Sequence, residues 1–161
     1  MQEKRKKIVE RTIKEFLTEL GAKKPAPGGG SAIALTAAIG ASLLQMVSNF
    51  SLKNLDAQSK KEMREVLEEI REIKRQLINY IDKDAKAVSR FFHKPNLFSQ
   101  KRRAQEMMHK IPEEVFKHCE QALKLIPFLA KKGNKNLSGD LRIARLLLQI
   151  GAKGAKELMV R

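Results

Sequence analysis

The sequence predicts an all-α fold, a bundle of about five helices in one domain spanning residues 1–161. Apolar residues recur at helical spacing through most of the chain, and no stretch shows the alternation typical of strands. A chain of 161 residues can bury a single core. From Pro25 to Leu52 there is no charged residue, although 32% of the chain is charged. Small residues fill this segment, so we expect it to form the central helix.

The first helix is expected from about Glu3 to Leu20, where an apolar stripe faces a basic side, and Gly21 ends it. The central helix follows from Ser31 to about Leu52. Thr36, Gln45 and other polar residues interrupt its apolar run, which favours a buried helix over a membrane span. Its small residues allow close packing and are Ala34, Ala37, Ala38, Gly40, Ala41 and Ser42.

A long third helix is expected from about Ala57 to Phe92, with a heptad-like apolar seam that the same spacing extends to Asp84. Lys94-Pro95-Asn96 should break this helix. A fourth helix starts near Ser99 and either kinks at Pro112 or ends and restarts there. The fourth helix is expected to end at Gly133-Asn134, and a last helix to run from Ser138 to the C-terminus. The seam residues of the third helix are Met63, Val66, Ile70, Ile73, Leu77 and Tyr80.

The composition points to an anionic partner. Lys and Arg number 33 against 18 Asp and Glu, which gives a formal net charge of +15. Aromatic residues make up only 5%, too few for a protein that stacks single-stranded bases, so nucleic acid is an unlikely partner. Cys119 is the lone cysteine, and the basic N-terminus has no apolar run behind it. These features favour a cytoplasmic protein without a membrane anchor.

The turn Pro25-Ala26-Pro27-Gly28-Gly29-Gly30-Ser31 precedes the uncharged helix. Its three glycines permit unusual backbone conformations and let a ligand approach closely. We expect Ser31 to be the N-cap of the helix, whose free N–H groups would suit an anion. The alternative is that the glycines only connect two helices tightly.

Two acids occupy positions where apolar residues are expected. Asp84 continues the seam of the third helix, and Asp140 lies on the inward side of the last helix. Burial raises the pKa of a carboxyl group towards the range useful for proton transfer. For Asp84, the alternative is a seam residue that reaches a backbone donor or a lysine. For Asp140, it is an ordinary acid in the first turn of a helix, where the helix dipole favours it. The three histidines show no metal-ligand spacing, so no metal site is predicted.

The segment PAPGGGSAIALTAAIGASLLQMVSNFS resembles the opening of the cyclodeaminase/cyclohydrolase family of folate enzymes. That opening is a Pro-x-Pro-Gly-Gly-Gly-Ser turn and a small-residue helix that ends in Met-Val-x-Asn-Leu-Thr. Later matches keep the family's order: Asp82-Lys83-Asp84-Ala85, Arg103, Ile111-Pro112, and Gly133-Asn134 followed by Asp140.

The resemblance implies an all-helical homodimer that acts on a tetrahydrofolate derivative, whose glutamate tail is anionic. It implies cyclodeamination of 5-formiminotetrahydrofolate to 5,10-methenyltetrahydrofolate and ammonia, or hydrolysis of 5,10-methenyltetrahydrofolate to 10-formyltetrahydrofolate. Neither reaction needs a metal or a bound cofactor. The second acid of the Asp-x-Asp-Ala segment, here Asp84, is the implied acid/base. The expected substrate-binding residues are Gly28, Gly29, Gly30, Ser31, Asn49, Asn134 and Asp140.

The chain departs from the family pattern at two positions. Gly139 replaces a serine before the late aspartate, and Leu158 replaces an asparagine in the closing segment. These changes leave open a folate-binding relative without catalysis. The basic charge alone leaves open a helical nucleic-acid-binding protein.

Overall fold

The computed structural model describes residues 6–93 and 98–160, and within this part of the chain every regular element is helical. The predicted all-α fold is therefore confirmed. The α-helices are α1 (Ile13–Leu20), α2 (Gly29–Ser51), α3 (Ala57–His93), α4 (Phe98–Lys132) and α5 (Ser138–Met159), and the 3-10 helices are η1 (Ile8–Glu10), η2 (Leu52–Asn54) and η3 (Lys135–Leu137).

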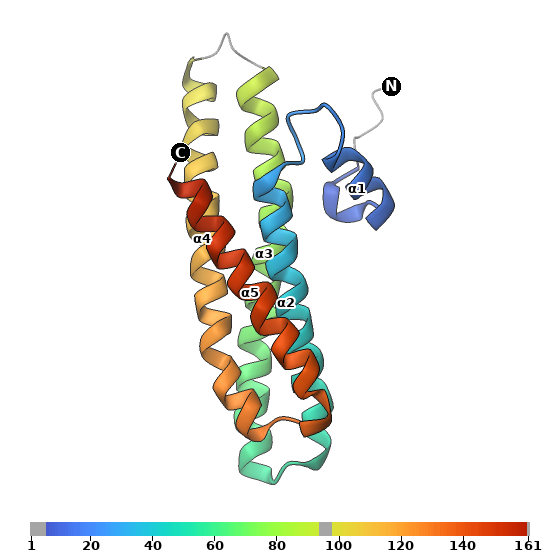
Figure 1. The fold of residues 1–161 in the computed structure, drawn as a ribbon. Helices are drawn as coiled ribbons and strands as arrows, with labels where there is room; N and C mark the ends of the chain where they lie inside the picture. Colours follow the sequence, from blue (N-terminus) through green and yellow to red (C-terminus); the bar gives the residue numbers. More distant parts are fainter. Residues whose placement is uncertain (1–5, 94–97, 161) are drawn as a thin grey trace.

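Helices α2 to α5 form an elongated four-helix bundle (Figure 1). Helix α2 packs against α3 and α5, and α4 packs against the same two helices on the other side. Helix α1 lies outside the bundle, near the end at which α2 begins (Figure 1). The predicted break at Lys94-Pro95-Asn96 falls outside the described residues.

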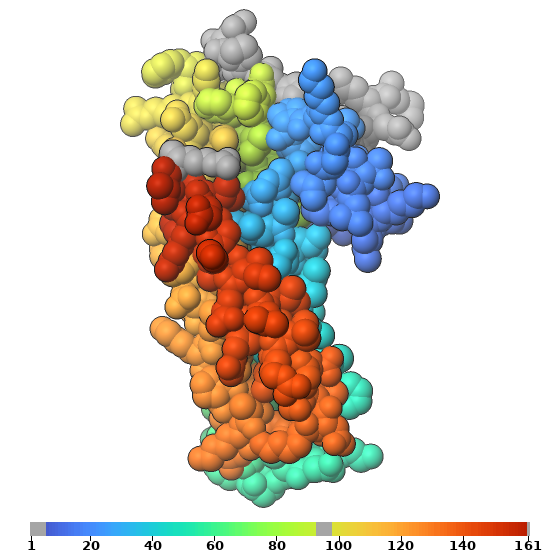
Figure 2. All heavy atoms as spheres, viewed as in Figure 1, coloured from blue at the N-terminus to red at the C-terminus, as the bar shows by residue number. Residues whose placement is uncertain are grey.

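Small residues let α5 cross closely over α2, and the two helices share the face seen in Figure 2. A Cβ atom on Gly40 of α2 would come within 2.9 Å of the Leu148 side chain. On α5, a Cβ atom on Gly151 would lie 3.0 Å from Ala37, and one on Gly154 would lie 2.7 Å from Ile33. The predicted role of small residues in close packing is therefore confirmed.

The core consists of apolar residues from all four long helices, together with Phe16 of α1. Cys119 is fully buried in it, and burial raises the pKa of its thiol to about 12. This agrees with the cysteine being a packing residue. Helix α2 with η2 is long and apolar enough to span a membrane, but half of its apolar window is buried against the other helices, as in a core helix.

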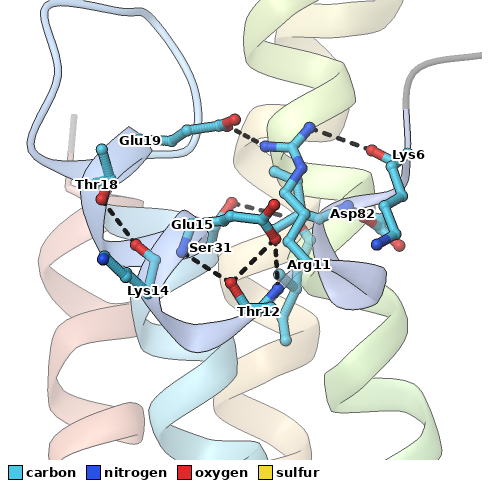
Figure 3. A network of polar contacts seen from close by, with 11 residues as sticks. Lys6, Arg11, Thr12, Lys14, Glu15, Thr18, Glu19, Ser31 and Asp82 are labelled. Atoms are coloured by element: carbon cyan, nitrogen blue, oxygen red, sulfur yellow. Dashed lines mark hydrogen bonds and ion pairs between the residues drawn. The ribbon is translucent and has the colours of Figure 1, made fainter. Parts of the chain in front are cut away.

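Helices α1 and α4 differ from the sequence-based predictions. The first expected helix is interrupted at Arg11 and Thr12, because Thr12 and Glu15 form a capping box that starts α1 there (Figure 3). Helix α4 runs without a break through Pro112 and Pro127, so the restart considered at Pro112 is wrong. Tertiary packing offsets the cost of a proline here, since Pro112 is fully buried.

Candidate functional site

The N-terminus of α2 and the C-terminal third of α3 meet at a buried carboxyl group. Asp84 of α3 is only 5% exposed, and its Oδ2 atom accepts a hydrogen bond from the Ser31 hydroxyl at 2.8 Å. Helix α2 begins at Gly29 with Gly28 as its N-cap, and no side chain caps the end. The expectation that Ser31 is the N-cap is wrong, because the helix starts two residues earlier and carries the serine inward.

Gly30 provides the space that the Asp84 carboxyl group occupies. A Cβ atom on Gly30 would overlap with Oδ1 and Cγ of Asp84 and would lie 2.8 Å from Oδ2. A side chain of any size at position 30 would therefore displace the carboxyl group. The expected unusual backbone is not observed, since no described glycine has a positive φ. The glycine at position 30 is required for space rather than for backbone freedom.

The burial of Asp84 makes the stability of the protein depend on pH. Burial raises the pKa of this carboxyl group, and hydrogen bonds from the Ser31 hydroxyl and amide oppose the rise. The folded protein thus keeps the proton to a higher pH than the unfolded chain does. This contribution to stability is complete below the unfolded pKa of about 3.9 and is lost as pH rises through the folded pKa.

We therefore expect Asp84→Asn to gain stability relative to wild type as pH rises from about 4 to 8, because an amide does not ionise. Each kcal/mol gained corresponds to a melting temperature higher by about 2–4 °C for a chain of this size. Urea denaturation of both proteins across this pH range measures the difference. A difference that is constant with pH would contradict the raised pKa.

Two basic concavities flank α3 directly beside Asp84. The first, of about 660 Å³, lies between α3, η1 and the segment before α2, and Ala26 and Ala85 are among its lining residues. The second, of about 790 Å³, lies between α3 and α4. Lys86 and Arg90 line both. Asp84 itself lines neither concavity: it faces the start of α2, whereas Lys86, two residues further on, lies on the opposite side of α3.

Positive charge dominates the second concavity, which is lined by five basic residues and one acid. The acid, Glu106, is already paired with Arg102 at 3.1 Å. An anionic group in this concavity would meet several cations and little competing negative charge. The basic residues are Lys83, Lys86, Arg90, Arg103 and Lys110.

The segment around η1 and α1 forms the outer wall of the first concavity (Figure 3). Asp82 accepts a hydrogen bond from the Ile8 amide at 2.8 Å and so ties η1 to α3. Arg11 forms an ion pair with Glu19 and donates to the Lys6 carbonyl oxygen. The two acids of the Asp-x-Asp-Ala segment therefore have different positions: Asp82 anchors the wall, and Asp84 points into the α2 corner.

Three of the predicted substrate-binding residues lie at the other end of the bundle. Asn134 donates its backbone N–H to Ser51, the last residue of α2, and its side chain accepts from Asn136 to cap η3. Asn49 is exposed near the same end, and Asp140 is half-buried in the first turn of α5. At 1.5 Å per residue, α2 separates this end from Gly30 by about 30 Å. Within one chain the structure does not bring these residues to Asp84.

Sequence reasoning missed the basic residues of α3. Lys83, Lys86 and Arg90 lie within two turns of Asp84 along α3, but their spacings turn them away from the face that carries Asp84, so the seam gave no signal for them. Leu158, one of the two departures from the family pattern, lies at the glycine corner. Its Cδ2 atom is 4.0 Å from the position that a Cβ atom would take on Gly29.

Comparison with known proteins extends over almost the entire chain. The family model described as formiminotransferase-cyclodeaminase matches residues 12–160. The chain belongs to this family. Its predicted membership is therefore confirmed. The matched residues include Gly30, Ser31 and Asp84, which form the buried corner.

Relatives of this family carry two different names. A methenyltetrahydrofolate cyclohydrolase of Methylorubrum extorquens is 30% identical over 156 residues, which cover 89% of this chain and 75% of the relative. A formimidoyltransferase-cyclodeaminase of Mus musculus is also 30% identical, over 92% of this chain, but the match covers only 30% of that longer protein. A crystal structure of formiminotetrahydrofolate cyclodeaminase from Thermotoga maritima has the same fold, with a TM-score of 0.83 and 24% identity over 93% of this chain and 77% of the other.

Proposed function

We propose that this protein is a one-carbon folate enzyme, with Asp84 as the acid/base of a cyclodeaminase or a methenyltetrahydrofolate cyclohydrolase. The observation that carries the proposal is the buried carboxyl group held by Ser31 at the start of α2, in a chain whose relatives bear these two names. A non-catalytic binder and a nucleic-acid-binding protein are not favoured, because the named relatives are enzymes of folate chemistry.

Both reactions move protons beside a carbon that carries or gains positive charge. In cyclodeamination, N10 of 5-formiminotetrahydrofolate attacks the carbon of the protonated formimino group, N10 loses a proton, and the resulting –NH2 group gains one and leaves as ammonia. In cyclohydrolysis, water adds to the methenyl carbon, loses a proton, and the ring opens at N5, which takes a proton. A carboxyl group of raised pKa can accept and return these protons, and its ionised form stabilises the adjacent positive charge. The direct test is the change in methenyltetrahydrofolate absorbance with purified protein.

The basic concavity between α3 and α4 is proposed to hold the glutamate tail of the folate. Three of its five cations lie on the helix that carries Asp84, and a tail bound there would leave the ring system at the same level of the bundle as the α2 corner. Carboxylates of the tail would pair with exposed Lys and Arg side chains, which gives a modest and salt-dependent gain in affinity.

We expect Arg103→Ala to raise KM for a polyglutamylated substrate about two- to fivefold at low salt, and to raise it less for the monoglutamate. Lys61→Ala, which removes an exposed charge from the distant part of α3, is the matched control and should change neither value. Steady-state kinetics at two salt concentrations measure the effect. Equal changes for both substrates would place the tail elsewhere.

We further propose that two copies of the chain pair through the α2–α5 face, which we define by its exposed apolar residues. Helix α2 carries no charge between residues 25 and 52, so its half of this face brings no lysine or arginine against the partner, whereas α5 adds the exposed Arg142 and Arg145 beside its apolar residues. In an antiparallel pair, the Ser51 end of one α2 would lie beside the Gly29 end of the other. Asn134 of one copy would then approach Asp84 of its partner. The face contains Ile39, Phe50, Ile143, Leu146 and Ile150.

We expect Ile39→Lys to convert a dimer into a folded monomer, because it places two like charges at the centre of the interface. Ile78→Lys on α3 changes a residue of similar exposure, 37% against 47% for Ile39, and should stay dimeric. Light scattering coupled to size-exclusion chromatography gives the mass. A monomeric wild type at tens of micromolar, or a dimeric Ile39→Lys variant, would contradict this interface.

A further inference from the structure

The Ser31 hydroxyl has two oxygen neighbours and one hydrogen to offer. Its Oγ atom lies 2.8 Å from Oδ2 of Asp84 and 3.1 Å from the carbonyl oxygen of Ile81. Both neighbours are acceptors when Asp84 is ionised, and a hydroxyl donates only one hydrogen bond. Both contacts are full hydrogen bonds only when Asp84 carries a proton. Asp84 then donates to Oγ, and Oγ–H donates to Ile81.

When Asp84 loses its proton, the same geometry serves the carboxylate. The Ser31 O–H turns from the Ile81 carbonyl to Oδ2, and a hydrogen bond to an ionised group is stronger than one to a neutral group. The Ile81 carbonyl remains inside α3, where the helical hydrogen-bonding pattern supplies a donor four residues on. Either protonation state of Asp84 is thus satisfied by rotation of one hydroxyl group.

The surroundings restrict other responses to a change of charge. Ser31 is fully buried, and Ile81 and Asp84 are 3% and 5% exposed, so bulk water has little access to the pair. Gly30 lies against Oδ1 and Cγ of Asp84 and fixes the other side of the carboxyl group. Two consecutive residues of α2 therefore hold both oxygens of the acid.

We infer that Ser31 is a positioning residue whose hydroxyl stabilises Asp84 in both protonation states, so that the acid takes up and releases a proton without moving its heavy atoms. The catalytic use of this arrangement rests on the proposed function, whereas the role of Ser31 in the titration of Asp84 rests on the hydrogen-bond geometry alone. Ser31 keeps its own hydrogen throughout; the proton that Asp84 gives or receives passes between Asp84 and the substrate.

The charged groups near this end of the bundle, including those that line the two concavities, are not among the causes of the shifted pKa of Asp84. Helix α2 contributes none, because residues 25–52 are uncharged. Desolvation raises the pKa of Asp84, and hydrogen bonding by Ser31 opposes the rise. A titration of Asp84 therefore reports mainly on Ser31 and on burial. The titratable groups on the elements packed around it are Asp82, Lys83 and Lys86 on α3, Arg11 after η1, Arg103 and Lys110 on α4, and Lys156 and Glu157 on α5.

The test is the carboxyl titration of Asp84, followed by NMR in protein labelled with ¹³C at the aspartate carboxyl carbons and assigned with Asp84→Asn. We expect Ser31→Ala to raise the pKa of Asp84 by about one unit or more, because the carboxylate loses a donated hydrogen bond. Ser31→Cys, close in size but a weak donor, should raise it in the same direction. If the enzyme is active, the acidic limb of its kcat/KM profile should shift by the same amount.

Ser48→Ala is the matched control. Ser48 is a fully buried serine of the same helix, and its hydroxyl donates to the Leu44 carbonyl at 2.9 Å, far from the acid. It should leave the Asp84 titration unchanged. An unchanged or lowered pKa in folded Ser31→Ala would overturn the inference. A raised pKa in a protein that turns over neither folate would sustain the inference and remove the proposed function.

Discussion

Asp84→Asn is expected to lower kcat by at least about two orders of magnitude while the protein stays folded. The amide has nearly the shape of the carboxyl group and can still accept the hydrogen bond that Ser31 donates at 2.8 Å. It cannot take up or release a proton in the catalytic range and carries no charge, so the variant removes acid/base chemistry and the stabilisation of positive charge while keeping the shape of the side chain. Turnover of both folates, with circular dichroism and thermal unfolding of the same samples, measures the effect.

Asp56→Asn provides the comparison for this variant. Asp56 is an exposed carboxylate at the start of the same helix, where its side chain accepts a hydrogen bond from the Ser59 amide at 3.0 Å. Asparagine caps helices as well as aspartate does, so this variant should keep both stability and turnover. Full activity in Asp84→Asn would remove Asp84 from the reaction, whatever its burial.

Gly30→Ala is expected to reduce both activity and stability, because the added methyl group overlaps with the carboxyl group of Asp84. Overpacking of this kind costs about 1–3 kcal/mol, and displacement of a catalytic group by about 1 Å can cost about a hundredfold in rate. We therefore expect kcat to fall at least about tenfold. Steady-state kinetics and urea denaturation give the two quantities.

Gly40→Ala separates these two effects. Its Cβ atom would also be crowded, lying 2.9 Å from Leu148 and 3.1 Å from the Ala144 carbonyl oxygen, but at the α2–α5 crossing and away from the acid. It should destabilise the fold by a similar amount and retain turnover. If both variants lose activity in proportion to their stability, the space at Gly30 has no special bearing on catalysis.

Periodicity predicted the fold well because the long helices bury continuous stripes. The seam from Met63 to Tyr80 is buried except for the half-buried Val66, and its extension correctly placed Asp84 in the interior. Helix ends were less predictable. Thr12 and Glu15 start α1 late through a local capping box, and burial of Pro112 keeps α4 continuous where propensity alone favours a break. Both outcomes depend on side-chain contacts that periodicity does not report.

The candidate site was only partly predictable. The heptad-like seam predicted a buried Asp84, and the glycine turn predicted one end of a site. The structure brings the two together through the hydrogen bond from Ser31 to Asp84. The glycines were expected to provide an unusual backbone conformation, whereas Gly30 provides space for the Asp84 carboxyl group. The sequence does not show which atom lies where the Cβ atom of another residue would be. The sequence also did not show the local contacts of Asn134. Its hydrogen bonds with Ser51 and Asn136 stabilise the turn before α5.

The most direct measurement is the absorbance of 5,10-methenyltetrahydrofolate during incubation with purified protein. Two substrates are supplied in separate reactions, the methenyl compound itself and 5-formiminotetrahydrofolate. We expect wild-type protein to accelerate loss of the signal from the first or its appearance from the second, and Asp84→Asn to do neither. If folded wild-type protein changes the absorbance no faster than buffer alone for either substrate, the assignment of this chain to folate catalysis is contradicted.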